Sequence, residues 1–94
     1  MVRYRVKPER VEEHLGLVRA VFAELEQKRP EGLRYTCLRA KDGLDFVHLA
    51  LVDAPEGNPL GGLAAFRAFT ERVNERCDEP PVTVQLDEVG AYRF

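Results

Sequence analysis

The 94-residue chain contains no tryptophan, one methionine, two cysteines and two histidines. The cysteines, Cys37 and Cys77, lie outside any Cys-x-x-Cys spacing, so the sequence predicts no thiol redox motif. The histidines, His14 and His48, lie far apart and on different predicted elements, a spacing that does not suit a metal site. No glycine-rich phosphate loop is present either, because Gly61-Gly62 lacks the rest of that pattern. We therefore expect no metal and no nucleotide-type cofactor.

The sequence also lacks an excess of one charge and any long hydrophobic run. The net charge is −2 and the pI is near 5.7, with both signs interspersed. Without a basic stripe to neutralise phosphates, nucleic acid is not an expected partner. No apolar run approaches the roughly 18 residues of a membrane span, and no apolar segment follows Arg3, Arg5 and Lys7 as it would in a signal peptide. These absences predict a cytoplasmic protein with reduced cysteines and no membrane partner.

The residues that are present indicate one globular domain spanning 1–94. Apolar residues make up 45% of the chain, charged residues 32% and aromatic residues 9%. A domain of this size buries only about 60–65% of the surface of its unfolded chain, so its stability margin is small. A second copy that covered an apolar sheet face would add to that margin.

Hydrophobic periodicity predicts six elements in the order strand, helix, strand, strand, helix, strand. Their expected ranges are 2–7, 8–29, 33–40, 45–52, 59–77 and 82–87, with a β-bulge where the alternation shifts at Glu88 and Val89. Asn58-Pro59 is expected to cap the second helix. This order predicts an α+β, ferredoxin-like βαββαβ fold, in which a four-stranded antiparallel sheet carries both helices on one face.

A regular apolar stripe identifies the inward face of the first helix. Its members recur at spacings of four and three residues: Val11, Leu15, Val18, Phe22 and Leu25. His14 lies beside this stripe, and we expect it at a surface edge near Arg10.

The hairpin from Leu33 to Asp53 is the strongest local signal. Asp42-Gly43 between two extended runs favours a two-residue type I′ turn, which needs a positive φ at both positions. The register that follows pairs Cys37 with His48, Arg39 with Phe46, Tyr35 with Ala50, Leu38 with Val47, Thr36 with Leu49 and Arg34 with Leu51.

The second arm, 46–52, is apolar except for His48, which indicates burial on both faces. Two helices cover only one face, so a second sheet from an identical chain is the expected cover for the other. The face carrying Leu38, Val47, Leu49 and Leu51 is the more apolar, and by burial it should carry the helices.

His48 is the main candidate for chemistry. An imidazole among apolar neighbours has a lowered pKa and could act as a neutral base toward a phenol or carbon acid; the alternative is a hydrogen-bonded core histidine. The residues that we expect to contact a ligand are Tyr35, Cys37, Arg39, Phe46, Phe66 and Phe69, several of which could instead be core or interface residues. Cys37 could be a nucleophile beside His48, but no orienting group or oxyanion motif accompanies the pair, and Cys77 is expected in the core.

Several segments along the chain resemble the antibiotic-biosynthesis-monooxygenase-like (ABM-like) family of dimeric α/β barrels, and especially a small uncharacterised subgroup of it. The segments are Tyr4-Arg5-Val6-Lys7-Pro8, Pro30-Glu31-Gly32-Leu33-Arg34-Tyr35, Asp42-Gly43 with Phe46-Val47-His48, Phe66-Arg67-Ala68-Phe69, and Glu79-Pro80-Pro81 with Glu88-Val89-Gly90. They span nearly the whole chain in order.

This resemblance implies a homodimer whose sheets pack into a barrel, with a small-molecule pocket between sheet and helices in each protomer. It also implies a cofactor-free monooxygenase acting on a small aromatic or quinone-like metabolite. The chain departs from such enzymes in having no tryptophan, and its second helix has no histidine for the haem ligand of the haem-degrading branch. A non-catalytic homodimer that binds a small hydrophobic molecule, or serves in assembly, is the alternative function. The family pocket also lies on the helix side, opposite to where the burial argument places His48.

Overall fold

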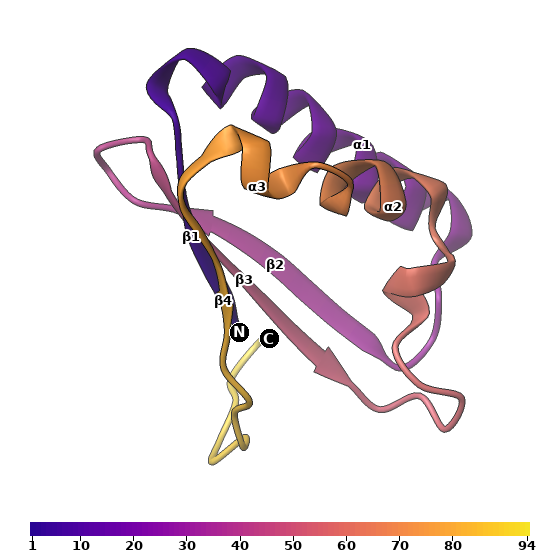
Figure 1. Ribbon diagram of the computed structural model, residues 1–94. Helices are drawn as coiled ribbons and strands as arrows, with labels where there is room; N and C mark the ends of the chain where they lie inside the picture. Colours follow the sequence, from indigo (N-terminus) through magenta and orange to yellow (C-terminus); the bar gives the residue numbers. More distant parts are fainter.

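The computed structural model describes residues 1–94. It consists of a four-stranded antiparallel sheet with helices packed on one face (Figure 1). The strand order is β2-β3-β1-β4. The strands are β1 (Val2–Val6), β2 (Leu33–Arg39), β3 (Asp45–Val52) and β4 (Cys77–Thr83); the helices are η1 (Pro8–Arg10), α1 (Val11–Lys28), η2 (Pro59–Gly62), α2 (Ala64–Thr70) and α3 (Val73–Arg76). The α+β prediction is confirmed, and the arrangement is compatible with a ferredoxin-like fold. No helix has the length and apolar character that crossing a membrane requires.

Helix α1 forms where its pattern predicted it. Pro8 occupies the first turn of η1, acidic residues follow in the first turn of α1, and the helix ends where Arg29 adopts a left-handed conformation. The most buried face, however, is Val11, His14, Val18 and Val21. His14 is fully buried, so the prediction of a surface histidine is wrong. The spacings of this face, three, four and three residues, are as regular as those of the stripe that was predicted.

The β2–β3 hairpin has the predicted register, including Cys37 opposite His48 and Tyr35 opposite Ala50. The predicted type I′ turn is wrong, because Gly43 has a positive φ and Asp42 does not. The strands instead close at Ala40 and Asp45 around a four-residue loop, in which the Asp42 carboxylate accepts a hydrogen bond from the Leu44 amide at 2.9 Å. A two-residue loop over 42–43 and a four-residue loop over 41–44 are centred on the same point, so both pair the same residues of the two strands. The register was therefore predicted correctly although the turn type was not.

The second helical segment is broken, in contrast to the single helix predicted over 59–77. The Asn58 cap is confirmed: its side chain accepts a hydrogen bond from the Leu60 amide at 3.0 Å. Helix α2 ends at Thr70, and Arg72 takes a left-handed conformation before α3. The Arg76 guanidinium donates to the carbonyls of Phe69 and Glu71 at this break, which satisfies backbone groups that a continuous helix would have paired internally.

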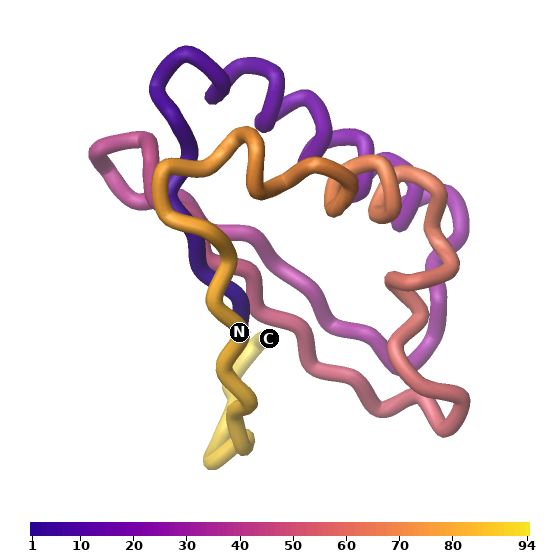
Figure 2. Tube along the Cα trace, viewed as in Figure 1, coloured from indigo at the N-terminus to yellow at the C-terminus, as the bar shows by residue number.

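The last strand begins earlier than predicted, and Cys77 is its first residue, buried in the core as expected but not helical. Pro80 and Pro81 fit there because β4 lies at the sheet edge and because they fall at a register shift between β1 and β4, where the regular ladder is interrupted. The predicted bulge at Glu88 and Val89 is wrong, since residues 84–94 form no regular element; the irregular pairing lies between β1 and β4. Figure 2 shows this C-terminal tail folding back toward the sheet, and Met1 and Phe94 line the same hollow.

The two faces of the sheet are the reverse of the burial prediction. Tyr4, Phe46 and His48 lie buried on the helix side, where His48 faces Phe69 of α2 at 5.2 Å between ring centroids. Leu38, expected beneath the helices, is 53% exposed. Leu49 and Leu51 lie against the tail instead. These aromatic and histidine rings can be buried against the helices because their few polar atoms are hydrogen-bonded to one another, which removes the cost of burying them.

Candidate functional site

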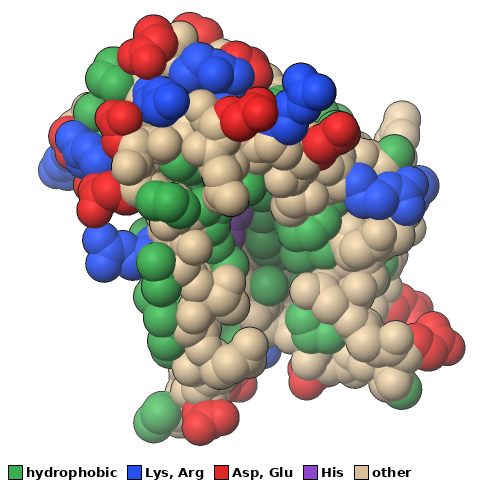
Figure 3. All heavy atoms as spheres, viewed as in Figure 1, with side chains coloured by type: hydrophobic (Ala, Val, Ile, Leu, Met, Phe, Trp, Pro, Cys, Tyr) green, Lys and Arg blue, Asp and Glu red, His purple; other side chains and the backbone are tan.

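A cavity of about 290 Å³ opens on the helix side of the sheet, above His48. Phe66 and Phe69 of α2 line it together with Tyr4, Tyr35 and His48 from three different strands. Figure 3 shows this hollow, with hydrophobic side chains on its walls and a histidine at its base. The remaining lining is mainly small or aliphatic, so the cavity suits a small, largely apolar molecule.

His48 is hydrogen-bonded at both ring nitrogens. Its Nδ1 lies 2.5 Å from the Tyr35 hydroxyl, and its Nε2 lies 2.6 Å from the Tyr4 hydroxyl. The Cys37 thiol contacts the same Nε2 at 3.4 Å. Neither nitrogen is left free of protein partners, so the action of His48 as a base, which stays a prediction, would need one of these bonds to open.

The hydrogen bonds continue from Tyr4 into the core. The Tyr4 hydroxyl lies 2.6 Å from Nε2 of His14, and Nδ1 of His14 accepts a bond from the Arg76 Nε at 3.2 Å. All three side chains are buried. We call these residues the tyrosine–histidine network: Arg76, His14, Tyr4, His48 and Tyr35.

Burial keeps the network's histidines and phenols uncharged at neutral pH. It lowers the pKa of His48 to about 4, and burial together with the Arg76 charge lowers the pKa of His14 to about 4. Burial raises the pKa of both Tyr4 and Tyr35, and it raises the pKa of the Cys37 thiol to about 11. A protonated thiol is a poor nucleophile, so the environment of Cys37 favours its packing interpretation over a catalytic one.

The other predicted ligand-contacting residues divide into two groups. Tyr35, Phe66 and Phe69 line the cavity with His48. Phe46 lies beneath it and stacks on Tyr4, with ring centroids 5.7 Å apart. Arg39 is exposed at the hairpin end, where it bonds the Gly43 carbonyl away from the cavity. The structure thus brings Tyr35, Phe66 and Phe69 together at the cavity. Arg39 lies outside it, with its guanidinium 5.8 Å from the centroid of the Phe46 ring.

Three network members, Tyr4, His14 and Arg76, were missed as site residues by sequence reasoning. Tyr4 could have been found, since it alternates with Arg3 and Arg5 on the apolar side of the first strand. His14 could have been found, since it lies three residues after Val11 and four before Val18. Arg76 carries no such signal, because a charged residue near the end of a polar helical segment ordinarily faces water. Its partner His14 lies 62 positions earlier in the sequence, and its partner Phe69 lies seven positions earlier.

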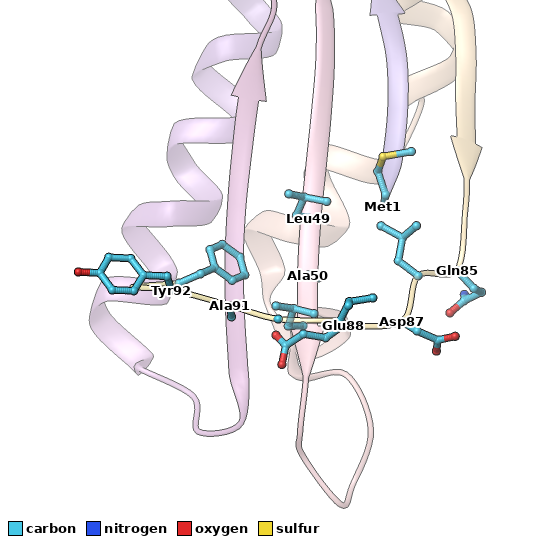
Figure 4. A pocket seen from close by; sticks show the side chains of 13 residues that line it. Met1, Leu49, Ala50, Gln85, Asp87, Glu88, Ala91 and Tyr92 are labelled. Atoms are coloured by element: carbon cyan, nitrogen blue, oxygen red, sulfur yellow. The ribbon is translucent and has the colours of Figure 1, made fainter.

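A second hollow, of about 550 Å³, lies on the opposite face between β3 and the C-terminal tail (Figure 4). Leu49 and Ala50 of β3 form one side, and tail residues from Gln85 to Tyr92 border the other. Arg34 holds the tail, pairing with Glu88 at 3.0 Å and donating to the Phe94 carbonyl at 2.6 Å. This hollow contains two carboxylates but no histidine, cysteine or lysine, so it offers less chemistry than the His48 cavity.

No cluster of three or more histidine, cysteine, aspartate or glutamate side chains is arranged to hold a metal ion. Comparison with protein-family models, with curated proteins and with solved structures finds no match to this chain. Functional inference therefore depends on the geometry of the cavity and the network beneath it.

Proposed function

We propose that this chain binds a small aromatic or quinone-like molecule in the His48 cavity, and that it is a cofactor-free monooxygenase toward that molecule, as the resemblance to the ABM-like family implies. The observation that supports this proposal most is the position of the tyrosine–histidine network at the base of an apolar cavity. The proposal also places the protein in the cytoplasm, in keeping with two cysteines that form no disulfide.

The walls of the cavity favour a flat ring. Phe66 and Phe69 lie 5.9 Å apart between centroids, and Phe69 packs directly against the His48 ring with 5.2 Å between centroids. Aromatic side chains contact flat rings well in stacked or edge-to-face geometry, each worth about 0.5–1.5 kcal/mol beyond area burial. An aliphatic chain would fill the same volume without these contacts.

The chemistry proposed requires only dioxygen as a co-reactant. A CH₂ group that is conjugated to a carbonyl through aromatic rings loses a proton to form an enolate, and the enolate transfers electrons to dioxygen. The balanced outcome converts CH₂ and O₂ into C=O and H₂O. The protein's part is to hold the ring, exclude water and stabilise the enolate oxygen by hydrogen bonding, which are the contributions that a dry polar cluster makes.

The test is oxygen uptake by the metal-free protein with anthrone, whose CH₂ group has this character. We expect uptake above the rate without protein, equal amounts of anthraquinone formed, and no effect of chelator. Phe69→Ala should lower the rate at least tenfold by opening the cavity, whereas the control Glu12→Ala on exposed α1 surface should not change it. A rate equal to the uncatalysed one, with anthrone bound, would leave ligand binding as the function.

The second candidate is a non-catalytic homodimer, and the outer face of the sheet favours its assembly. Leu38 is 53% exposed and Val82 56% exposed on this face, and Leu86 of the tail is 56% exposed. Such apolar exposure over a sheet is typical of a surface that another protein covers. We propose that a second copy covers it, sheet against sheet, which would form the dimeric α/β barrel.

Light scattering after size exclusion tests the dimer. At micromolar concentration we expect a mass of twice the 10.7 kDa chain. Leu38→Lys should shift the population toward monomer, and Glu12→Lys on the helix side should not. A mass of one chain across a dilution series would exclude the homodimer while leaving the cavity proposal intact.

A further inference from the structure

The direction of every hydrogen bond in the tyrosine–histidine network follows from one fixed donor. Arg76 is a cation whose guanidinium nitrogens only donate. Its Nε points at Nδ1 of His14 at 3.2 Å, so that nitrogen must carry the lone pair. A neutral His14 then bears its proton on Nε2, which can only donate. The neighbour of Nε2 is the Tyr4 hydroxyl oxygen, and that oxygen is therefore an acceptor.

Tyr4 has one hydroxyl proton and two close imidazole nitrogens. Since its oxygen accepts from His14, its proton is directed to the other contact, Nε2 of His48. Nε2 of His48 must then be unprotonated, which also suits the Cys37 thiol at 3.4 Å as a second, weaker donor. A neutral His48 consequently carries its proton on Nδ1.

The series of hydrogen bonds that starts at Arg76 ends at Tyr35. Nδ1 of His48 donates to the Tyr35 hydroxyl oxygen at 2.5 Å. The hydroxyl proton of Tyr35 has no other acceptor in the protein, and Tyr35 lines the cavity. Phe22 stacks against its ring, with 5.2 Å between centroids, and holds the ring in place. The network thus has one charged donor at its buried end and one unused donor at the cavity.

We propose that Arg76 polarises this network so that Tyr35 presents a hydrogen-bond donor to the cavity, and that the ligand is selected for an acceptor oxygen, as in an aromatic ketone or quinone. Tyr35 is the specificity-determining residue, and Arg76, His14, Tyr4 and His48 are positioning residues. The ligand class rests on the proposed function; the direction of the bonds does not. The same donor would stabilise the enolate oxygen of the proposed reaction.

Nuclear magnetic resonance of the ¹⁵N-labelled wild-type protein tests the direction without any ligand. Two-bond ¹H–¹⁵N correlation spectra at pH 7 distinguish the two imidazole tautomers. We expect the proton of His14 on Nε2 and the proton of His48 on Nδ1. The opposite tautomer at either histidine, or a charged imidazole, would overturn the proposal. No variant is needed, so a folding defect cannot obscure the result.

Binding of a ketone and a matched hydrocarbon tests the ligand class. The probes are 1-tetralone and tetralin, which share two fused rings and differ at one oxygen. Tyr35→Phe should weaken 1-tetralone binding by about three- to tenfold, as loss of one neutral hydrogen bond predicts, and should leave tetralin unchanged. The control is Tyr92→Phe, the same substitution on an 82% exposed side chain of the tail.

The outcomes separate the two proposals. Equal loss of both probes in Tyr35→Phe would show that Tyr35 only shapes the cavity, which overturns the donor role. A carbonyl stretching frequency of bound 1-tetralone that is lowered in the wild type and restored in Tyr35→Phe would support it. Failure of both probes to bind the wild type would overturn the aromatic-ligand proposal and the ligand class together, while the tautomer spectra would still decide the direction of the network.

Discussion

The Nε atom of Arg76 lies 3.2 Å from Nδ1 of His14, and both side chains are buried although 62 positions separate them in the sequence. Through this contact the end of α3 is joined to α1 and, by way of Tyr4, to the sheet. A buried cation with neutral partners is costly unless its donors are paired, and Arg76 pairs three of its nitrogens.

Removing the Arg76 guanidinium should be strongly destabilising. Arg76→Met keeps much of the apolar stem but leaves the carbonyls of Phe69 and Glu71 without their donor. We expect the free energy of unfolding to fall by about 2–4 kcal/mol, measured by urea denaturation. The control is Arg19→Met on the exposed side of α1, for which about 0.5 kcal/mol or less is expected. Similar values for the two variants would contradict the role given to Arg76.

Stability should fall on mild acidification. His14 and His48 have pKa values near 4 in the folded protein, below the ordinary value of 6.5. Between these values the unfolded chain binds more protons than the folded one, so stability is fully present above pH 6.5 and is lost as pH falls toward 4. Each histidine adds a slope of at most roughly 1.4 kcal/mol per pH unit. Urea midpoints between pH 7 and pH 5 measure this slope, above the range where most carboxylates titrate.

Histidine replacement provides the control for that pH dependence. His14→Gln and His48→Gln should each flatten the slope between pH 7 and pH 5, because glutamine does not titrate there. A slope that is unchanged in both variants would assign the acid sensitivity to carboxylates such as Glu13, Glu24 and Asp42, whose pKa values are lowered by their hydrogen bonds and which therefore act in the same direction.

The imidazole of His48 should remain neutral to well below pH 6. Burial is the cause of its lowered pKa, and its hydrogen-bond partners are two phenols and a thiol with no carboxylate among them. An NMR titration of the ring Cε1 proton should give a pKa near 4. Titration near 6.5 would mean that bulk water reaches this ring, and titration above 6.5 would mean that a carboxylate does.

His48→Gln should keep the fold. The amide can replace one of the bonds that the ring makes to Tyr4 and Tyr35, so we expect a loss of about 1–3 kcal/mol and an unchanged circular dichroism spectrum. If His48 acts as a base, oxygen uptake with anthrone collapses in this variant although the protein stays folded. Nearly intact uptake would assign His48 to the structure of the site alone.

Protein purified from cells should carry no stoichiometric metal, haem or flavin. The sequence has no phosphate-binding loop, and the side chains that could ligate a metal are not clustered. Metal analysis and a visible spectrum after dialysis measure this directly. A persistent absorption band, or a metal content near one per chain, would show that a ligand set had been misidentified.

Local patterns determined much of the fold. Period-two alternation and the apolar run 46–52 located three of the strands, and the parity of the loop around Asp42-Gly43 set every pair of the β2–β3 hairpin. The N-cap at Asn58 was also predictable, because its hydrogen bond spans two residues. These features depend on neighbours in sequence, which is why residue identities alone specify them.

Contacts between distant segments decided the rest. The sequence pointed to Tyr35, His48, Phe66 and Phe69 as possible neighbours, but it placed the more apolar strand face under the helices and His14 in water. Hydropathy scales count every buried polar atom as unfavourable. Here, however, Tyr4, His14, His48 and Arg76 come from four elements, hydrogen-bond one another and are buried together. Such mutual satisfaction exists only once β1, β3, α1 and α3 are packed, so the tertiary structure alone determined which face became the core and where the cavity opened.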